Sequence, residues 1–252
     1  GAKGNDGYVE LCFAPASARA LFHGLTPRAV EARIFNSAVS HDRQRYAFNS
    51  KGERYLHMYI GTQFGCRHDT DIEVLSQLGV LNVDQTPSEP WTEWTTDTLT
   101  GMRERFDKYG INLEMIHIPL GSAPASENGA GAVFLGPSDE RDRQIDRLCE
   151  IVRMASEAGL RGLNYNITIL GHLRTPSRTG RGGAKLSSFE YDKLDQSLGE
   201  FEFGTADEDT MWERIDHWLQ QIMPVAEEYK IQMACHPSDP GIGYGNTYRG
   251  VA

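Results

Sequence analysis

From residue 57 onward, short apolar runs alternate with segments whose apolar residues recur at helical spacing. The runs are rich in β-branched and aromatic residues, which is typical of strands. We predict strands over residues 57–64, 80–84, 111–120, 162–170 and 231–236. The segments between them predict helices over residues 71–78, 97–109, 138–159 and 209–229, three of which end at a glycine. Pro224 is expected to kink the last helix.

This alternation of strand and helix predicts an α/β fold with a parallel sheet, and the length of 252 residues is typical of one TIM barrel. Only about five of the eight βα units of a closed barrel can be placed. We therefore divide the chain into an irregular N-terminal extension, residues 1–56, and a βα-barrel domain, residues 57–252, which we expect to be truncated at its C-terminal side. Within the extension, residues 7–13 have strand character and residues 27–35 have short helical character, whereas residues 40–55 are polar and without a period.

Parallel α/β sheets place their chemistry at the carboxyl ends of the strands. The last predicted strand ends at His236, which is followed by Pro237, Ser238 and Asp239. An imidazole in this place, with a carboxylate shortly after it, suits a divalent metal ion or a polar substrate. The alternative is a histidine that hydrogen-bonds a turn, with Asp239 capping that turn.

The fourth predicted strand carries Asn166 near its end, and His172 and Arg174 follow it. Residues 171–189 hold four basic side chains and no acidic one, within a protein of net charge −10. Arginine binds carboxylates bidentately, so this segment is a candidate site for an anionic substrate such as a sugar acid. A solvated, mobile loop that happens to be basic is an equal alternative. The basic residues are Arg174, Arg178, Arg181 and Lys185.

Other side chains near strand ends carry weaker signals. His117 stands alone in an apolar strand, which is more typical of a hydrogen-bonded core residue than of a site residue. Trp91 and Trp94 could stack on a sugar ring, and packing against a helix is at least as good an interpretation. Gln63 and Arg67 follow the first strand as polar contacts without a specific pattern.

Charge and cysteine content narrow the class of protein. A net charge of −10 argues against nucleic acid as the main partner, because polyanion binding needs a positive field. No apolar run is long enough to span a membrane. The four cysteines are widely spaced and predict free thiols in a reducing compartment, the cytoplasm, with a periplasmic or secreted location as the alternative. Strand alternation places Cys235 on the other face from His236, so we do not expect it to be a nucleophile.

Four stretches resemble the mannonate dehydratase family of the xylose-isomerase-like TIM barrels. They are LEMIHIPL at 113–120, SDERDRQIDRLCEIVRMASEAGLRGLNYN at 138–166, RTPSRTGRGGA at 174–184 and MPVAEEYKIQMACHPSDP at 223–240. The most specific features are Tyr165-Asn166 and the final block that ends in HPSDP. Two departures stand out: Ser238 replaces an acidic residue of the family pattern, and the tryptophan-rich signature after the first strand is missing.

The resemblance implies an eight-stranded barrel that dehydrates D-mannonate to a 2-keto-3-deoxy sugar acid. It also implies a divalent metal, with Mn²⁺ favoured over Mg²⁺ or Co²⁺, and His236 as one of its ligands. By this resemblance the remaining ligands and the acid–base residues come from later strands, so we expect them beyond Ala252.

We therefore predict a metal-dependent dehydratase, a lyase, whose partner is a small sugar acid and whose assembly is a homo-oligomer. His236 is the expected metal ligand, and the expected substrate-binding residues are Asn166, His172, Arg174 and Asp239. A metal-dependent sugar isomerase or epimerase on the same barrel is the first alternative. A non-catalytic sugar-binding protein or an inactive fragment is the second.

Overall fold

The computed structural model describes residues 46–48, 54–56 and 60–252 of the chain. The chain divides between Ser40 and His41, and every described residue belongs to the second of the two units. The strand and the helix expected over residues 7–13 and 27–35 lie outside the described residues, and so does Cys12.

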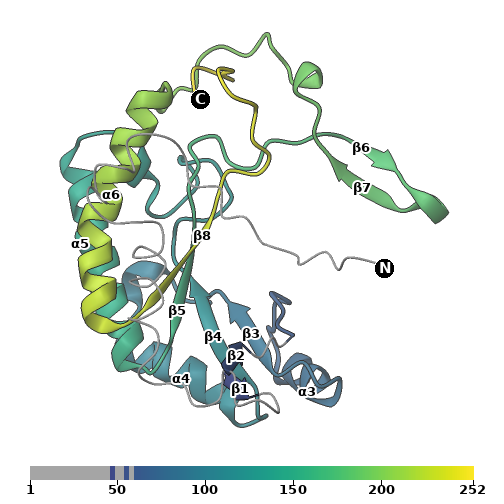
Figure 1. Cartoon of the computed structure of the whole chain (residues 1–252), viewed down its shortest axis with the longest axis vertical. Coiled ribbons are helices and arrows are strands. Elements are labelled where there is room, and N and C mark those ends of the chain that lie inside the picture. Colours follow the sequence, from purple (N-terminus) through teal and green to yellow (C-terminus); the bar gives the residue numbers. More distant parts are fainter. Residues whose placement is uncertain (1–45, 49–53, 57–59) are drawn as a thin grey trace. The chain divides into compact units, whose positions relative to one another are not determined.

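The main sheet consists of parallel strands that follow one another in the sequence. They are β3 (Asn82–Gln85), β4 (Asn112–His117), β5 (Gly162–Asn166) and β8 (Gln232–His236), in the spatial order β3-β4-β5-β8 (Figure 1). Sequential parallel strands with helices between them are the arrangement of a TIM barrel, so the predicted fold class is confirmed. Among the described residues no strand pairs with the free edge of β8, and the sheet remains open.

Within residues 60–64, the described part of the first predicted strand, the structure forms a single bridge and not a longer strand. Of residues 57–64, the part from residue 60 onward is described, and it contributes one parallel bridge between Thr62 and Val83. The backbone N–H groups of Thr62 and Asp84 donate to the carbonyls of Asn82 and Thr62, at 3.1 and 3.0 Å. This bridge extends the sheet beyond β3 and positions the segment that follows Thr62.

Helices lie close to their predicted positions. They are α3 (Asp69–Gln77), α4 (Thr96–Asp107), α5 (Asp139–Glu157) and α6 (Glu208–Tyr229). Local sequence sets the starts of three, because the side chains of Thr95, Ser138 and Asp207 accept hydrogen bonds from the backbone N–H three residues later. The last helix continues through Pro224. No helix in the described part of the chain is long and apolar enough to cross a membrane.

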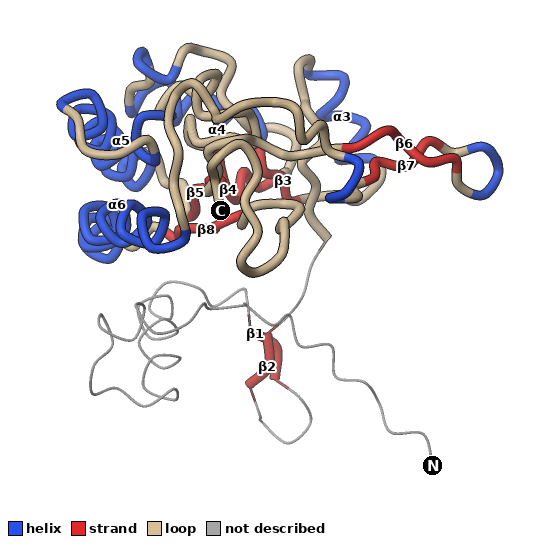
Figure 2. The backbone as a smooth tube through the Cα atoms, turned by 90° about the horizontal axis from the view of Figure 1, so that it is seen from above, coloured by secondary structure: helices blue, strands red, loops and turns tan. Residues whose placement is uncertain are grey.

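Packing of α5 and α6 against the sheet determines which way β5 presents its side chains (Figures 1 and 2). Trp218 of α6 is fully buried and packs edge-on against Phe134 and Tyr165. Tyr165 therefore faces the helices. Because side chains alternate along a strand, Asn164 and Asn166 face the opposite side of the sheet.

Two antiparallel pairs replace segments that were expected to be irregular. Residues Tyr46–Phe48 (β1) pair with Arg54–Leu56 (β2). Residues Thr175–Thr179 (β6) pair with Lys185–Ser188 (β7), within the basic segment 171–189. The turn between β6 and β7 uses Gly182 and Gly183 at φ of 68° and 82°, a left-handed conformation that favours glycine. The β6–β7 hairpin extends away from the sheet (Figures 1 and 2).

Short 3₁₀ turns complete the described structure. They span Trp91–Glu93, Gly131–Phe134, Arg181–Gly183 and Tyr191–Lys193.

Candidate functional site

The carboxyl ends of β5 and β8 bring three of the predicted site residues together. Asn166 pairs in register with His236. The ring of His172 lies 5.3 Å from the ring of His236, measured between centroids. Nδ2 of Asn166 is 3.4 Å from Nε2 of His172. An amide nitrogen can only donate, so Nε2 of His172 is the acceptor and its proton resides on Nδ1.

Arg174 and Asp239 form an ion pair beside these residues. Nη1 of Arg174 donates to the carbonyls of Leu173 and Asp239, at 2.8 and 2.9 Å, and Nη2 lies 3.3 Å from Oδ2 of Asp239. The guanidinium thereby fastens the turn that follows β8, and much of its charge is already paired. All five residues predicted for the site thus lie at one end of the sheet, while their roles stay predictions.

Electrostatics keep His172 neutral. Burial lowers the pKa of His172, and the neighbouring His236 and Arg174 lower this pKa further, whereas Asp239 raises it. A histidine whose pKa falls below its usual value of about 6.5 carries no charge near neutral pH. His172 therefore serves as a hydrogen-bonding group there and not as a cation.

A hydrogen bond to the backbone fixes the tautomer of His236. Its Nδ1 lies 2.9 Å from the carbonyl of Pro237, and because that oxygen can only accept, Nδ1 carries the proton. The lone pair on Nε2 is then the one that can bind a cation, as in histidine ligands oriented by a backbone carbonyl. Within residues 46–48, 54–56 and 60–252, no group of three or more His, Cys, Asp or Glu side chains is arranged to hold a metal ion. His236 fits as one ligand of a set that these residues do not complete.

The basic segment does not form a four-residue anion site. Arg178, Arg181 and Lys185 are exposed on the β6–β7 hairpin. Arg178 lies 3.2 Å from Glu190. Of the four basic residues, Arg174 is the one that lies at the site, because the segment folds as a projecting hairpin and not as a loop over the strand ends.

Trp94, Cys66 and Cys149 are buried, whereas Cys235 is exposed. Trp94 is 3% exposed, and its Nε1 donates to the carbonyl of Glu89 at 2.9 Å, which favours packing over sugar stacking. Burial raises the pKa values of the Cys66, Cys149 and Cys235 thiols, all of which are free. A protonated thiol is a poor nucleophile. Cys235 also contacts Tyr165, on the face away from His236.

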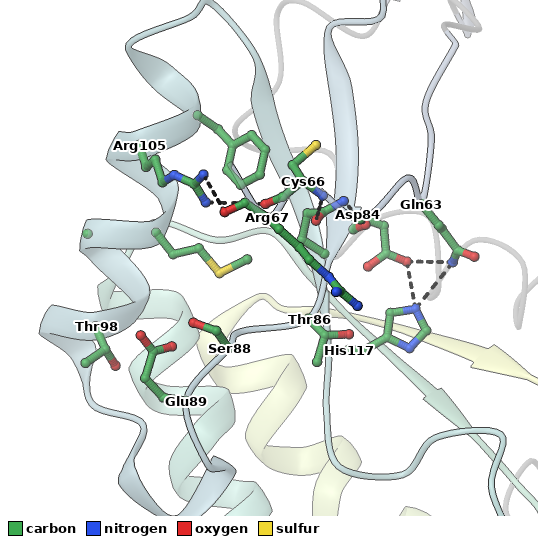
Figure 3. Close-up of a pocket in the computed structure, with 15 residues that line it drawn as sticks. Gln63, Cys66, Arg67, Asp84, Thr86, Ser88, Glu89, Thr98, Arg105 and His117 are labelled. Atoms are coloured by element: carbon green, nitrogen blue, oxygen red, sulfur yellow. Dashed lines mark hydrogen bonds and ion pairs between the residues drawn. The ribbon is translucent and has the colours of Figure 1, made fainter. Parts of the chain in front are cut away.

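A second polar cluster, the Asp84 cluster, joins β3, β4, β5 and the segment after Thr62 (Figure 3). Oδ2 of Asp84 accepts from Nε2 of Gln63 at 2.8 Å and from Nδ2 of Asn164 at 2.9 Å, and Nε2 of His117 lies 3.2 Å away. Asp84 is 7% exposed, whereas the His117 side chain is 27% exposed. His117 is therefore not the enclosed core residue that its sequence context favours.

Sequence reasoning missed Asp84. The available signal was a carboxylate one residue before the end of a buried strand, at the edge of the sheet where function is expected. We applied that rule to the loop after Asp84 and not to Asp84 itself.

Acid titration should expose the contribution of Asp84 to stability. Burial raises the pKa of Asp84, but hydrogen bonds from His117, Asn164 and Gln63 outweigh burial and hold this pKa below its usual value. The stabilisation of the fold by the Asp84 carboxylate is therefore present above the pKa of this group in the unfolded chain, about 4, and is lost as the pH falls below that value. We expect Asp84→Asn to cost about 2–3 kcal/mol at neutral pH and progressively less as the pH falls below about 4. Urea unfolding followed by circular dichroism across this range measures the difference, and a pH-independent difference would contradict the assignment.

Comparison with known proteins agrees with the fold and with the sequence motifs. The parallel sheet and the helices that cover it define an α/β protein of the TIM-barrel type. The family model described as D-mannonate dehydratase (UxuA) matches residues 181–245. The chain is similar to the mannonate dehydratase of Bacillus subtilis (strain 168), with 27% identity over 178 residues, 58% of this chain and 47% of that protein. It is also similar to the mannonate dehydratase of Thermotoga neapolitana, with 26% identity over 213 residues, 70% of this chain and 57% of that protein.

A solved structure shares the fold. It is the mannonate dehydratase from Streptococcus suis serotype 2, with a TM-score of 0.60, 18% identity and coverage of 73% of this chain and 54% of that chain. The chain spans about half the length of the curated relatives that it matches. These matches confirm the resemblance to mannonate dehydratases that the sequence motifs indicated.

Proposed function

We propose that this chain carries part of the active site of a metal-dependent dehydratase that acts on a sugar acid such as D-mannonate. The observation that carries the proposal is the position of His236. It lies within the segment matched by the D-mannonate dehydratase model, and in the structure it lies against His172 at the carboxyl end of the sheet. The similarity to curated mannonate dehydratases supports the same reaction class.

In this proposal His236 holds a divalent metal, for which Mn²⁺ is our first choice, through Nε2. When bound, such a cation stabilises the negative charge that develops on a carboxylate substrate as the C2 proton is removed. Hydrogen bonding between Nδ1 of His236 and Pro237 keeps the imidazole oriented and keeps its Nε2 lone pair available.

The surrounding residues bind and orient. Nδ2 of Asn166 and the neutral His172 offer hydrogen bonds to substrate hydroxyls beside His236. Arg174 holds the turn that contains Asp239, and the two side chains line the approach to His236. The acid–base residues, the homo-oligomeric state and the cytoplasmic location stay predictions.

A dehydration assay of this chain joined to the strands that would complete the metal-ligand set tests the proposal. We expect Mn²⁺-dependent release of a 2-keto-3-deoxy acid from D-mannonate, selected from a panel of aldonic and uronic acids, and loss of that product when EDTA removes the metal. Unchanged turnover after complete chelation would defeat the metal assignment. Interconversion of neutral ketoses without any keto-deoxy acid would instead indicate an isomerase or epimerase.

A further inference from the structure

A cavity of about 810 Å³ opens beside the Asp84 cluster, and none of the five predicted site residues lines it. It lies between the ends of β3 and β4 and the length of α4, from Thr98 to Phe106 (Figure 3). Small-molecule sites have volumes of about 300–1,000 Å³, so a compound of six or seven carbons fits. The lining includes Gln63, Arg67, Asp84, Glu89, Arg105 and His117.

Arg67 is the uncommitted cation of this cavity. The guanidinium of Arg105 is already engaged, because Nε donates to Asp69 at 2.7 Å and the terminal nitrogens donate to the carbonyls of Cys66 and Arg67. The Arg67 side chain extends into the cavity (Figure 3), and no hydrogen bond or ion pair ties it to a described residue. A guanidinium presents five donors in a fork that matches a carboxylate.

Two acceptors of the Asp84 cluster are also without a partner. Oδ1 of Asp84 is buried and has no hydrogen bond to a described residue, although Oδ2 has two amide donors and a histidine nearby. All the contacts of His117 within the described residues are made by Nε2. Nε2 of His117 also lies 3.2 and 3.4 Å from the amide nitrogens of Asn164 and Gln63, but both amides donate at shorter distances to Oδ2 of Asp84. We therefore assign the proton of a neutral His117 to Nε2, which faces the same carboxylate oxygen, and this leaves Nδ1 as an acceptor. A buried acceptor without a donor is costly, so Oδ1 needs a donor.

Besides the exposed carboxylate of Glu89, the cavity offers one unpaired cation and two unpaired acceptors, which suit a ligand with one anionic group and several hydroxyls. We propose that this cavity binds the carboxylate of a sugar acid at Arg67, with its hydroxyl groups donating to Oδ1 of Asp84 and Nδ1 of His117. The substrate class rests on the proposed function. The contrast with Arg174 supports the choice of arginine, because Arg174 is paired with Asp239 whereas Arg67 is not paired.

Binding in the absence of metal tests this assignment. With EDTA present, we expect D-mannonate to bind the full chain in isothermal titration calorimetry and Arg67→Gln to weaken that binding at least about tenfold, as loss of a charge-assisted pair does. Arg143→Gln is the matched control, since it removes the same charge from an exposed arginine that pairs with Glu140 on α5. It should change the dissociation constant less than about twofold.

The hydroxyl contacts have their own readout. In ¹⁵N spectra of the imidazoles, we expect His117 to carry its proton on Nε2 and the Nδ1 resonance to shift when D-mannonate is added. His117→Gln should weaken binding about three- to tenfold while the far-ultraviolet dichroism stays unchanged. An unshifted Nδ1 resonance at saturating D-mannonate would overturn the assignment of His117.

Three results would overturn the carboxylate assignment. The first is an equal change of the dissociation constant in Arg67→Gln and in the control Arg143→Gln. The second is loss of binding in Arg174→Gln but not in Arg67→Gln. The third is the absence of D-mannonate binding by the unmodified chain. The binding measurement involves neither metal nor turnover, so its outcome is independent of the outcome of the dehydration assay. Binding without dehydration would retain this inference and reject the proposed function.

Discussion

Replacing His236 with alanine is expected to weaken Mn²⁺ binding more than about 100-fold and to abolish Mn²⁺-dependent dehydration of D-mannonate. The reason is that Nε2 of His236 is the oriented lone pair at the strand end, and Nδ1 is held by Pro237. Loss of a residue that merely orients a ligand costs about 10–100-fold, so loss of the ligand itself should cost more. Mn²⁺ titration monitored by electron paramagnetic resonance, together with the dehydration assay, measures both effects.

A second histidine provides the control for this change. His217 lies on α6, 3.9 Å from Asp142, away from the strand ends. His217→Ala should retain Mn²⁺ binding and turnover within about twofold, because it removes only a weak surface interaction. Retention of stoichiometric Mn²⁺ binding by His236→Ala would show that His236 is not a ligand.

Trp218→Ala is expected to destabilise the fold by about 3–5 kcal/mol, the largest stability effect that we predict. Trp218 is 0% exposed and touches Phe134 and Tyr165, so truncation leaves a cavity behind the strand that carries Asn164 and Asn166. Urea unfolding followed by far-ultraviolet dichroism gives the change in free energy.

Trp218→Phe separates packing from hydrogen bonding. Nε1 of Trp218 has no hydrogen-bond partner among the described residues, so substitution by phenylalanine removes no hydrogen bond. The phenylalanine ring also fills part of the cavity that alanine would leave. We expect the phenylalanine variant to lose less than half of what the alanine variant loses. Equal losses in the two variants, or a loss below about 1 kcal/mol in Trp218→Ala, would mean that Trp218 is not a central packing residue.

Local patterns predicted most of the parallel sheet and its helices. Ser138 marks the start of α5 because a short side chain can accept a backbone hydrogen bond at that place, and this signal needs no tertiary information. The strand-end rule likewise selected Asn166, His172 and His236, which the structure brings together. The sequence resemblance added the metal and the reaction class, which no periodicity could supply.

The remaining features depend on contacts between distant residues. The Asp84 cluster needs β3, β4 and β5 side by side, and Asp84 and Asn164 are 80 positions apart. The β6–β7 hairpin was taken for a loop because its strands are short and mostly polar, so they lack the alternation of a half-buried strand. The pairing of Arg174 with Asp239 joins residues 65 positions apart, and no local signal reveals that its charge is already used.

Every residue of β5 is buried. Two positions apart on this strand lie Asn164, which donates to Asp84, and Asn166, which pairs in register with His236 and lies beside His172. Two residues of a strand rise about 6.7 Å. The spacing of their Cα atoms is therefore set by the backbone. Under the proposed function, a compound that contacted both side chains would have to match this spacing, so the number of carbons between its carboxylate and its far hydroxyls would be a criterion for selection among sugar acids.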